Sequence, residues 1–195
     1  MEGRVALVTG ANSGIGKATV RELVVRGAHV FAACRSRERM ESLLAEIRAA
    51  VPQAHIEGVA LDLGDFMSVR ACAADVLSRG LPLHLLVNNA GVVPSRGSFS
   101  KSGFEIAFGV NHLGHFLLTE LLRDRIRESA PSRIVTVASD VHRRASGFDW
   151  DALRKPTRSL TGFSEYCVSK LANVLFSAEL ARRLDQSGVT NYAIH

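Results

Sequence analysis

Tyr166 and Lys170 have the residue types and the spacing needed for shared proton chemistry. Residues four apart in a helix lie on the same face, one turn from each other. A free tyrosine has a pKa of about 10, and a nearby ammonium group favours the phenolate, which makes the phenol usable as an acid or base near neutral pH. The pattern alone is common by chance, and a tyrosine at an interface beside a solvated lysine would show it too.

Two further polar residues lie where their side chains could serve a reaction. Ser139 directly follows a strand-like run at residues 133–138, so we expect it at the carboxyl end of a buried strand, where ligands bind in open α/β sheets. Its hydroxyl could donate a hydrogen bond to a carbonyl oxygen, or it could simply form a turn. Asn111 interrupts a helical pattern between Gly109 and Gly114, which indicates a kink with a side-chain or water partner, or a plain interruption.

A glycine-rich turn follows the first apolar run of the chain. The string from Thr9 to Gly16 reads TGANSGIG and opens a helical pattern. Glycines at such a turn let the backbone approach a pyrophosphate, and the N–H groups of the helix N-terminus bind its phosphates. Three glycines could also form an ordinary turn, but their place after the first strand favours nucleotide binding. The candidate binding residues are Gly10, Asn12, Ser13, Gly14, Ile15 and Gly16.

The elements that would position these residues alternate along the whole chain. Strands are expected at residues 4–8, 29–33, 56–61, 83–88, 133–138 and 190–194, and helices near residues 14–26, 37–50, 66–79, 103–128 and 164–186. Several of the strands are apolar throughout, as in sheets that are covered on both faces. The alternation predicts an α/β fold with a doubly wound parallel sheet, a Rossmann fold, in a single domain over residues 1–195.

Composition excludes several classes of protein. With 195 residues, of which 47% are apolar and 22% charged, the chain can bury a substantial core and is neither disordered nor fibrous. No apolar run reaches the roughly 20 residues of a membrane-spanning helix, and the N-terminus lacks a signal-peptide pattern. We therefore expect no membrane span and a cytoplasmic location. The net charge of +5 is dispersed along the chain, which disfavours nucleic acid as a partner.

Neither the cysteines nor the histidines form a metal-binding pattern. The three cysteines are widely spaced and include no CxxC pair, which disfavours a disulfide framework and a zinc site. His112 and His115 are accompanied by no third ligand motif, so packing roles are expected for both. The sequence therefore predicts no metal site.

Together these motifs resemble those of the short-chain dehydrogenase/reductase family. The glycine spacing at residues 10–16 and the string NNAG at residues 88–91, after the fourth expected strand, are similar to two of its signatures. Its catalytic tetrad is matched, in the same order along the chain, by Asn111, Ser139, Tyr166 and Lys170. Residues 104–119 and 166–176 resemble the branch of the family that is retinol dehydrogenase-like.

The resemblance implies a reaction and a role for each residue. The reaction is hydride transfer between NADP(H) and a small-molecule alcohol or carbonyl substrate that is lipophilic: retinal-like, steroid-like or aliphatic. Tyr166 would exchange the proton, and Ser139 would hold the substrate oxygen. Lys170 would bind the nicotinamide ribose together with Tyr166, and Asn111 would hold a water in the proton path. The family's further cofactor contacts fall on Asp62, Leu63, Asn89, Ala90 and Gly91.

The residues after the second strand bear on the choice between NADP(H) and NAD(H). Enzymes that use NAD place an acid here, on the ribose 2′-hydroxyl, whereas this chain reads CRSR at residues 34–37 and has no acid before Glu38. A carboxylate would repel a 2′-phosphate, and a guanidinium can bind it with two hydrogen bonds. Arg35 is the predicted phosphate ligand, with Ser36 and Arg37 as helpers, and NAD(H) is the less favoured coenzyme.

Two expectations concern the protein as a whole. Residues 190–194 resemble a sixth strand, and relatives in the family continue beyond that point into a further strand and a substrate-covering segment, so we expect a C-terminally truncated chain. The family commonly packs two of its helices against their symmetry mates, which predicts a homo-oligomer, most simply a homodimer. The alternative from another class of protein is a nucleotide-binding scaffold without turnover, which would leave the tetrad without a purpose.

Overall fold

The computed structural model describes residues 1–195 and contains one six-stranded sheet. Its strands are β1 (Val5–Thr9), β2 (His29–Cys34), β3 (Ile56–Ala60), β4 (Leu85–Asn88), β5 (Ser132–Val137) and β6 (Val189–Ile194). The α-helices are α1 (Gly14–Val25), α2 (Arg37–Ala50), α3 (Phe66–Ser78), α4 (Gly114–Glu128) and α5 (Phe163–Arg183). A π-helical turn, η1 (Phe108–Leu113), precedes α4, and two 3₁₀ turns, η2 (Asp140–Arg144) and η3 (Ala152–Arg154), lie between β5 and α5.

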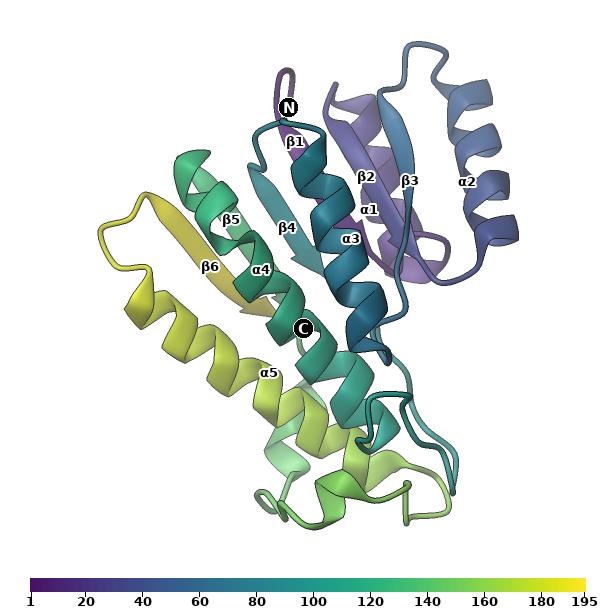
Figure 1. Ribbon diagram of the computed structural model, residues 1–195, viewed down its shortest axis with the longest axis vertical. Helices are drawn as coiled ribbons and strands as arrows, with labels where there is room; N and C mark the ends of the chain where they lie inside the picture. The colour runs from purple at the N-terminus through teal and green to yellow at the C-terminus, as the bar shows by residue number, and fades with distance from the viewer.

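All the strands are parallel and follow the order β3-β2-β1-β4-β5-β6 across the sheet (Figure 1). The order reverses between β1 and β4, because the chain first builds outward to β3 and then returns to the other side of β1. Doubly wound sheets bind their ligands at such a switch point, beyond the carboxyl ends of the strands. The expected α/β fold with a doubly wound parallel sheet is confirmed.

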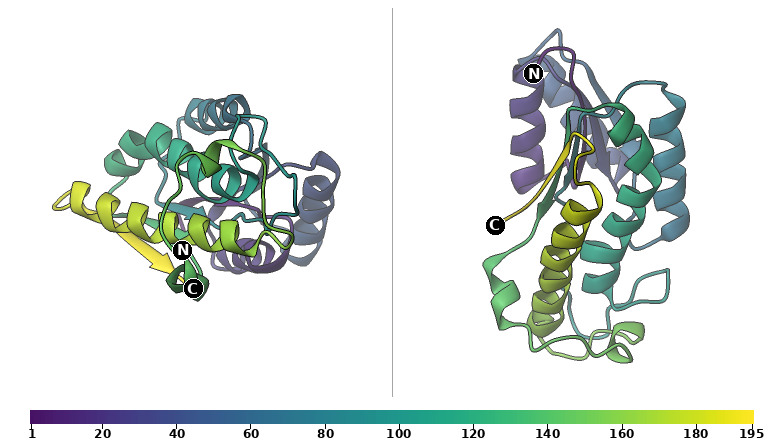
Figure 2. Two further views of the ribbon diagram at one scale, coloured as in Figure 1. Left: turned by 90° about the horizontal axis from the view of Figure 1, so that it is seen from below. Right: turned by 90° about the vertical axis from the view of Figure 1, so that its left-hand side faces the viewer.

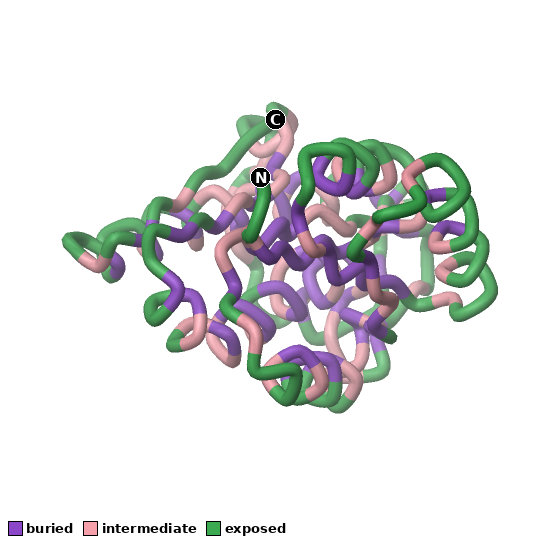
Figure 3. The backbone as a smooth tube through the Cα atoms, turned by 90° about the horizontal axis from the view of Figure 1, so that it is seen from above, coloured by how far each residue is buried: buried purple, intermediate pink, exposed green.

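Helices cover both faces of the sheet (Figure 2). Alternate side chains of each strand point to opposite faces, so Leu7 of β1 packs in a core with α3, α4 and α5, while its neighbours Ala6 and Val8 pack in a second core with α1 and α2. The buried backbone lies in the middle of the molecule, and the exposed backbone surrounds it (Figure 3). None of the helices combines the length and the apolarity needed to cross a membrane.

The helix expected at residues 103–128 begins later than its sequence pattern suggested. Gly103 has a φ of +81°, which ends any helix there, and Glu105 is extended and forms an isolated bridge to Phe99. The Glu105 carboxylate then accepts a hydrogen bond from the backbone N–H of Phe108 at 2.8 Å. The interruption expected at Asn111 is the π-helical turn η1, and such turns are frequent at functional sites.

Candidate active site

A cleft of about 970 Å³ runs along the carboxyl ends of the strands. Its volume lies near the upper end of the range for cofactor sites. Most of the sequence-predicted site residues line it: Gly10, Asn12, Ser13, Gly14, Ile15, Arg35, Ser36, Asp62, Leu63, Asn89, Ala90, Gly91, Ser139, Tyr166 and Lys170. Of the others, Gly16 and Asn111 lie in the buried layer behind the wall of the cleft, and Arg37 is exposed outside it.

The turn between β1 and α1 requires glycine at positions 10 and 16. Gly10 has a φ of +66°, and a Cβ on it would lie 2.9 Å from the Cα of Ala90. A Cβ on Gly16 would overlap the carbonyl oxygen of Gly10, so this glycine lets α1 pack against the turn. Ser13 precedes α1 without forming a side-chain cap, which leaves the N–H groups of the first turn available to an anion. The turn therefore fits a dinucleotide pyrophosphate.

Thr9 fastens this turn to the loop after β4. Its Oγ1 accepts hydrogen bonds from the backbone N–H groups of Asn89 at 2.9 Å and Ala90 at 3.0 Å. In return, the Asn89 side chain donates to the backbone carbonyl of Thr9 at 2.8 Å. The two loops at the switch point of the sheet are thus held as one unit. Thr9 was not among the predicted site residues, although it opens the glycine string.

The end of the cleft beyond β2 is basic. Ser36 caps α2, with its Oγ accepting a hydrogen bond from the backbone N–H of Arg39 at 3.3 Å. Arg35 and Arg39 both line the cleft, whereas Arg37, the expected helper, lies outside it, exposed and 3.9 Å from Glu41. The first turn of α2 therefore brings residue 39, rather than residue 37, into the cleft that Arg35 also lines. The sequence signal that was missed is the spacing of three residues from the helix cap Ser36 to Arg39, which places Arg39 in the first turn of α2.

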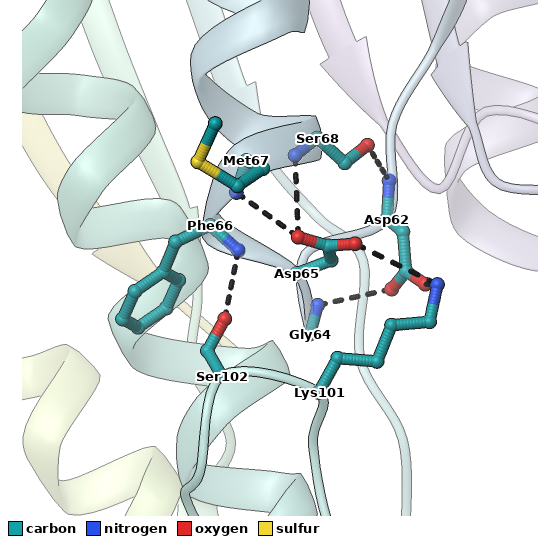
Figure 4. A network of polar contacts seen from close by, with 8 residues as sticks. All are labelled: Asp62, Gly64, Asp65, Phe66, Met67, Ser68, Lys101 and Ser102. Carbon is teal, nitrogen blue, oxygen red and sulfur yellow. Dashed lines mark hydrogen bonds and ion pairs between the residues drawn. The ribbon is translucent and has the colours of Figure 1, made fainter.

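The turn after β3 fixes the carboxylate of Asp62 at the wall of the cleft (Figure 4). Asp62 Oδ1 accepts a hydrogen bond from the Gly64 N–H at 3.0 Å. Lys101, from the loop between β4 and η1, lies 3.5 Å from Asp62 and 3.6 Å from Asp65, and thus joins two carboxylates. The neighbouring Ser102 accepts a hydrogen bond from the Phe66 N–H. The long loop after β4 is in this way attached to the turn after β3.

Tyr166 and Lys170, the pair predicted to exchange a proton, lie at the other end of the cleft, on α5. The Lys170 ammonium lies 5.5 Å from the centre of the Tyr166 ring and donates a hydrogen bond to the carbonyl of Val137 at 2.7 Å. An ammonium has three donors, so two remain for a ligand. Burial lowers the pKa of Lys170 to about 8. The lysine is thus poised between its charged and neutral forms at mildly alkaline pH.

Ser139 enters the cleft from the end of β5. It caps η2, and its Oγ accepts a 3.5 Å hydrogen bond from the backbone N–H of Val141. Its backbone carbonyl accepts a hydrogen bond from His142 Nδ1 at 2.7 Å. These contacts fix the position of the serine and leave its O–H free to donate into the cleft, where Tyr166 and Lys170 also lie.

Asn111 lies behind the cleft, where its side chain hydrogen-bonds the loop after β4 and helix α5. Its amide donates to the carbonyl of Val92 and to Ser169 Oγ, both at 3.0 Å, and its Oδ1 accepts from the Val92 N–H at 2.7 Å. Ser169 in turn donates to the backbone carbonyl of Tyr166 at 2.7 Å. Both amide protons of Asn111 are therefore used to join η1, the loop after β4 and α5. Ser169 was not predicted, but its spacing of three from Tyr166 places it one helical turn away.

Comparisons with known proteins agree with this geometry. The family model described as short chain dehydrogenase matches residues 4–149. Human retinol dehydrogenase 12 is 48% identical over 195 residues, which are 100% of this chain and 61% of that protein. The chain thus spans less than two thirds of the length of this relative.

Two solved structures extend the comparison. An uncharacterized protein from Mycobacterium paratuberculosis has a TM-score of 0.81 and 38% identity, with 98% of this chain and 67% of that chain covered. Actinorhodin polyketide ketoreductase, solved with NADPH, has a TM-score of 0.77 and 30% identity, with 97% and 67% covered. The chain belongs to the short-chain dehydrogenase family. Within that family it is retinol dehydrogenase-like, which confirms the resemblance seen in its sequence.

Proposed function

We propose that the protein is an NADP(H)-dependent oxidoreductase that interconverts an alcohol with a ketone or an aldehyde. The observation that carries the proposal is that one cleft contains both the glycine turn and the side chains of Ser139, Tyr166 and Lys170. A bound NADPH supplies a hydride from its nicotinamide ring. The chain itself supplies the binding groups, the orientation and the proton.

The cleft offers a matching group for each part of the coenzyme. The glycine turn and the N-terminus of α1 suit the pyrophosphate, and the carboxylate of Asp62 suits the adenine amino group. Arg35 and Arg39 suit a 2′-phosphate, since each guanidinium can form paired charged hydrogen bonds. The remaining ammonium protons of Lys170 suit the nicotinamide ribose. The ketoreductase solved with NADPH, which has the same fold, supports the choice of NADP(H) over NAD(H).

The proton step is assigned to Tyr166. In the reductive direction its hydroxyl donates to the substrate oxygen while Ser139 donates a second hydrogen bond to the same atom. The ammonium of Lys170, close to the phenol ring, stabilises the phenolate that is left. Since both amide protons of Asn111 are already used, any water in the proton path would be bound by an oxygen atom of Asn111.

The walls of the cleft favour a lipophilic substrate. Apolar side chains from the loop after β4 and from the start of the following helix line it: Val92, Val93, Ile106 and Val110. Similarity to a protein named as a retinol dehydrogenase supports the same choice. A retinoid, a steroid or an aliphatic carbonyl would bury apolar area against these side chains.

Replacement of Tyr166 by Phe tests the function. We expect Tyr166→Phe to lower turnover at least about 100-fold, which is the lower bound for general acid catalysis, while NADPH binding stays within about twofold. The matched control is Tyr192→Phe, because Tyr192 is the other tyrosine and lies on β6, outside the cleft. Turnover is measured as the loss of NADPH absorbance with retinoid, steroid and aliphatic carbonyls.

Two results would contradict the proposal. Turnover by Tyr166→Phe within about tenfold of the unaltered protein, a barrier change of roughly 1.4 kcal/mol or less, would remove the role of Tyr166. Tight NADPH binding by the unaltered protein with no turnover on any class of carbonyl would favour the nucleotide-binding scaffold.

A further inference from the structure

His115 is a buried polar residue for which the proposed reaction has no role. It lies in the first turn of α4, one helical turn after Asn111, with 1% of its surface exposed. Its ring bridges two elements of the site. Nε2 lies 2.8 Å from Thr9 Oγ1 at the end of β1, and Nδ1 lies 3.0 Å from the backbone carbonyl oxygen of Asn111.

The hydrogen bonds around Thr9 determine where the protons of this ring lie. Thr9 Oγ1 already accepts from the N–H groups of Asn89 and Ala90, so both of its lone pairs are used. In the 2.8 Å contact Thr9 must therefore be the donor and His115 Nε2 the acceptor. The ring proton is then on Nδ1, where it is donated to the carbonyl of Asn111. A single neutral tautomer satisfies every group in the contact.

The electrostatic surroundings favour this neutral form. The pKa of His115 is lowered to about 4, chiefly by burial; the hydrogen bond to Asn111 opposes this shift, and the neighbouring Lys170 and His112 add to it. A protonated ring would also point an Nε2–H at Thr9 Oγ1, whose two lone pairs already accept the N–H groups of Asn89 and Ala90. The ring is thus held neutral at physiological pH.

The bridge connects the coenzyme loops to the catalytic tyrosine. From Thr9 the hydrogen bonds pass through the ring of His115 to the carbonyl of Asn111. The amide of Asn111 continues to Ser169, which donates to the backbone of Tyr166. Every contact in this path is between buried or half-buried groups, where hydrogen bonds are strong and their loss is costly.

We propose that His115 is a positioning residue that holds the carbonyl of Asn111 in the π-helical turn through its Nδ1–H, and so fixes Asn111 between the coenzyme loops and Tyr166. The proposal rests on the oxidoreductase function proposed above. The proposal predicts that the hydrogen bond from Nδ1 to Asn111 matters more for turnover than the hydrogen bond between Nε2 and Thr9. Loss of the hydrogen bond to Thr9 leaves no donor unpaired, because the Thr9 hydroxyl can donate instead to the carbonyl of Val87 at 3.3 Å. Loss of the hydrogen bond to Asn111 leaves the Asn111 carbonyl without its side-chain donor.

Substitution of His115 by asparagine or by glutamine distinguishes the two hydrogen bonds of the ring, because each amide retains only one of them. The amide of an asparagine at 115 occupies the place of Nδ1, and that of a glutamine occupies the place of Nε2. We expect His115→Gln to lower kcat about tenfold and His115→Asn to keep kcat within about threefold, with the dissociation constant of NADPH within about threefold in both. The control is His55→Gln, because His55 is exposed and remote from the cleft. Equal losses of kcat in both variants, or no loss in either, would overturn the proposal.

A second measurement needs no variant and no turnover. The ring nitrogen chemical shifts of His115 in the unaltered protein, assigned by NMR, are expected to show a protonated Nδ1 and an unprotonated Nε2 at pH 7. A protonated Nε2 would overturn the proposal whatever the kinetics. Absence of carbonyl turnover in the unaltered protein would instead contradict the proposed function, and the tautomer would then decide the structural role of His115 alone.

Discussion

At the residue scale, the proposed preference for NADPH depends on the different surroundings of two arginines that lie two positions apart. Arg35 lines the cleft, and Arg37 lies outside it beside Glu41. We expect Arg35→Asp to weaken NADPH binding at least about tenfold, and NADH binding by less than about twofold. The reason is that only NADPH carries the 2′-phosphate, which loses a guanidinium and meets a carboxylate. Arg37→Asp introduces the same change of charge outside the cleft and serves as the control.

Fluorescence titration of both coenzymes measures this preference. Equal weakening of NADPH and NADH by Arg35→Asp would place the phosphate site elsewhere. If Arg37→Asp weakened NADPH binding as much as Arg35→Asp, the effect would come from the positive charge around the start of α2 and not from direct contact of Arg35 with the phosphate.

A second residue-scale prediction follows from the depressed pKa of Lys170, which burial lowers to about 8. Below this pH the side chain is an ammonium, and above it a neutral amine that forms weaker hydrogen bonds. NADPH affinity should therefore fall as pH rises from 7 to 9.5. We expect a loss of about fivefold, since charged hydrogen bonds exceed neutral ones by roughly 1 kcal/mol.

Direct titration of NADPH across this pH range tests the assignment without involving the proton step at Tyr166. Lys170→Met should bind NADPH more weakly at pH 7, and its affinity should not change with pH between 7 and 9.5. An unchanged pH dependence in Lys170→Met would attribute the titration to another group.

At the element scale, the sequence predicted what depends on periodicity and missed what depends on tertiary contacts. The strands and helices around the cleft have apolar patterns that suffice to place them, and α1, α2 and α3 begin within a residue of the expected position. The helix expected from residue 103 starts later because Gly103 has a positive φ and because Glu105 binds the N–H of Phe108. Neither feature has a periodic signature.

The same distinction holds for the candidate site residues. The glycine turn, Ser139, Tyr166 and Lys170 could be found because they lie at strand ends or at helical spacings that a sequence displays. The functions of Thr9 and His115 could not, since their hydrogen bond joins residues 106 positions apart in the chain. Arg39 is an intermediate case, since its place in the cleft could have been predicted from a local signal. That signal is the helix cap at Ser36, which fixes where α2 begins.

At the scale of the whole molecule, the site is divided between the two halves of the sheet. The glycine turn follows β1, and the basic end of the cleft follows β2. Ser139, Tyr166 and Lys170 come after β5 in the chain. The loop after β4 touches both parts. On the first side it contacts Thr9 and, through Lys101, the Asp62 turn; on the second it contacts Asn111, which binds Ser169 of α5. A coenzyme bound along the cleft would therefore contact segments from both halves of the sheet.

The outer surface of α4 and α5 leads to the last prediction, which concerns assembly. These helices lie on the same face of the sheet, with α5 toward its β6 edge (Figure 1). They expose apolar side chains, with Phe116 at 43% and Leu175 at 50% exposure, and Phe116 packs edge-on against Phe176 at 5.4 Å. Burial of these side chains against a second copy would stabilise a homodimer.

Light scattering at micromolar concentration should give twice the mass of one chain. The double substitution Phe116→Asp with Leu175→Asp should give a monomer, because it places charges in the apolar contact. Val25→Asp provides the matched control: Val25 is 59% exposed at the end of α1, on the opposite face of the sheet, and should leave the dimer intact. A monomeric unaltered protein would exclude this assembly. A dimer that survives the double substitution would place the interface elsewhere.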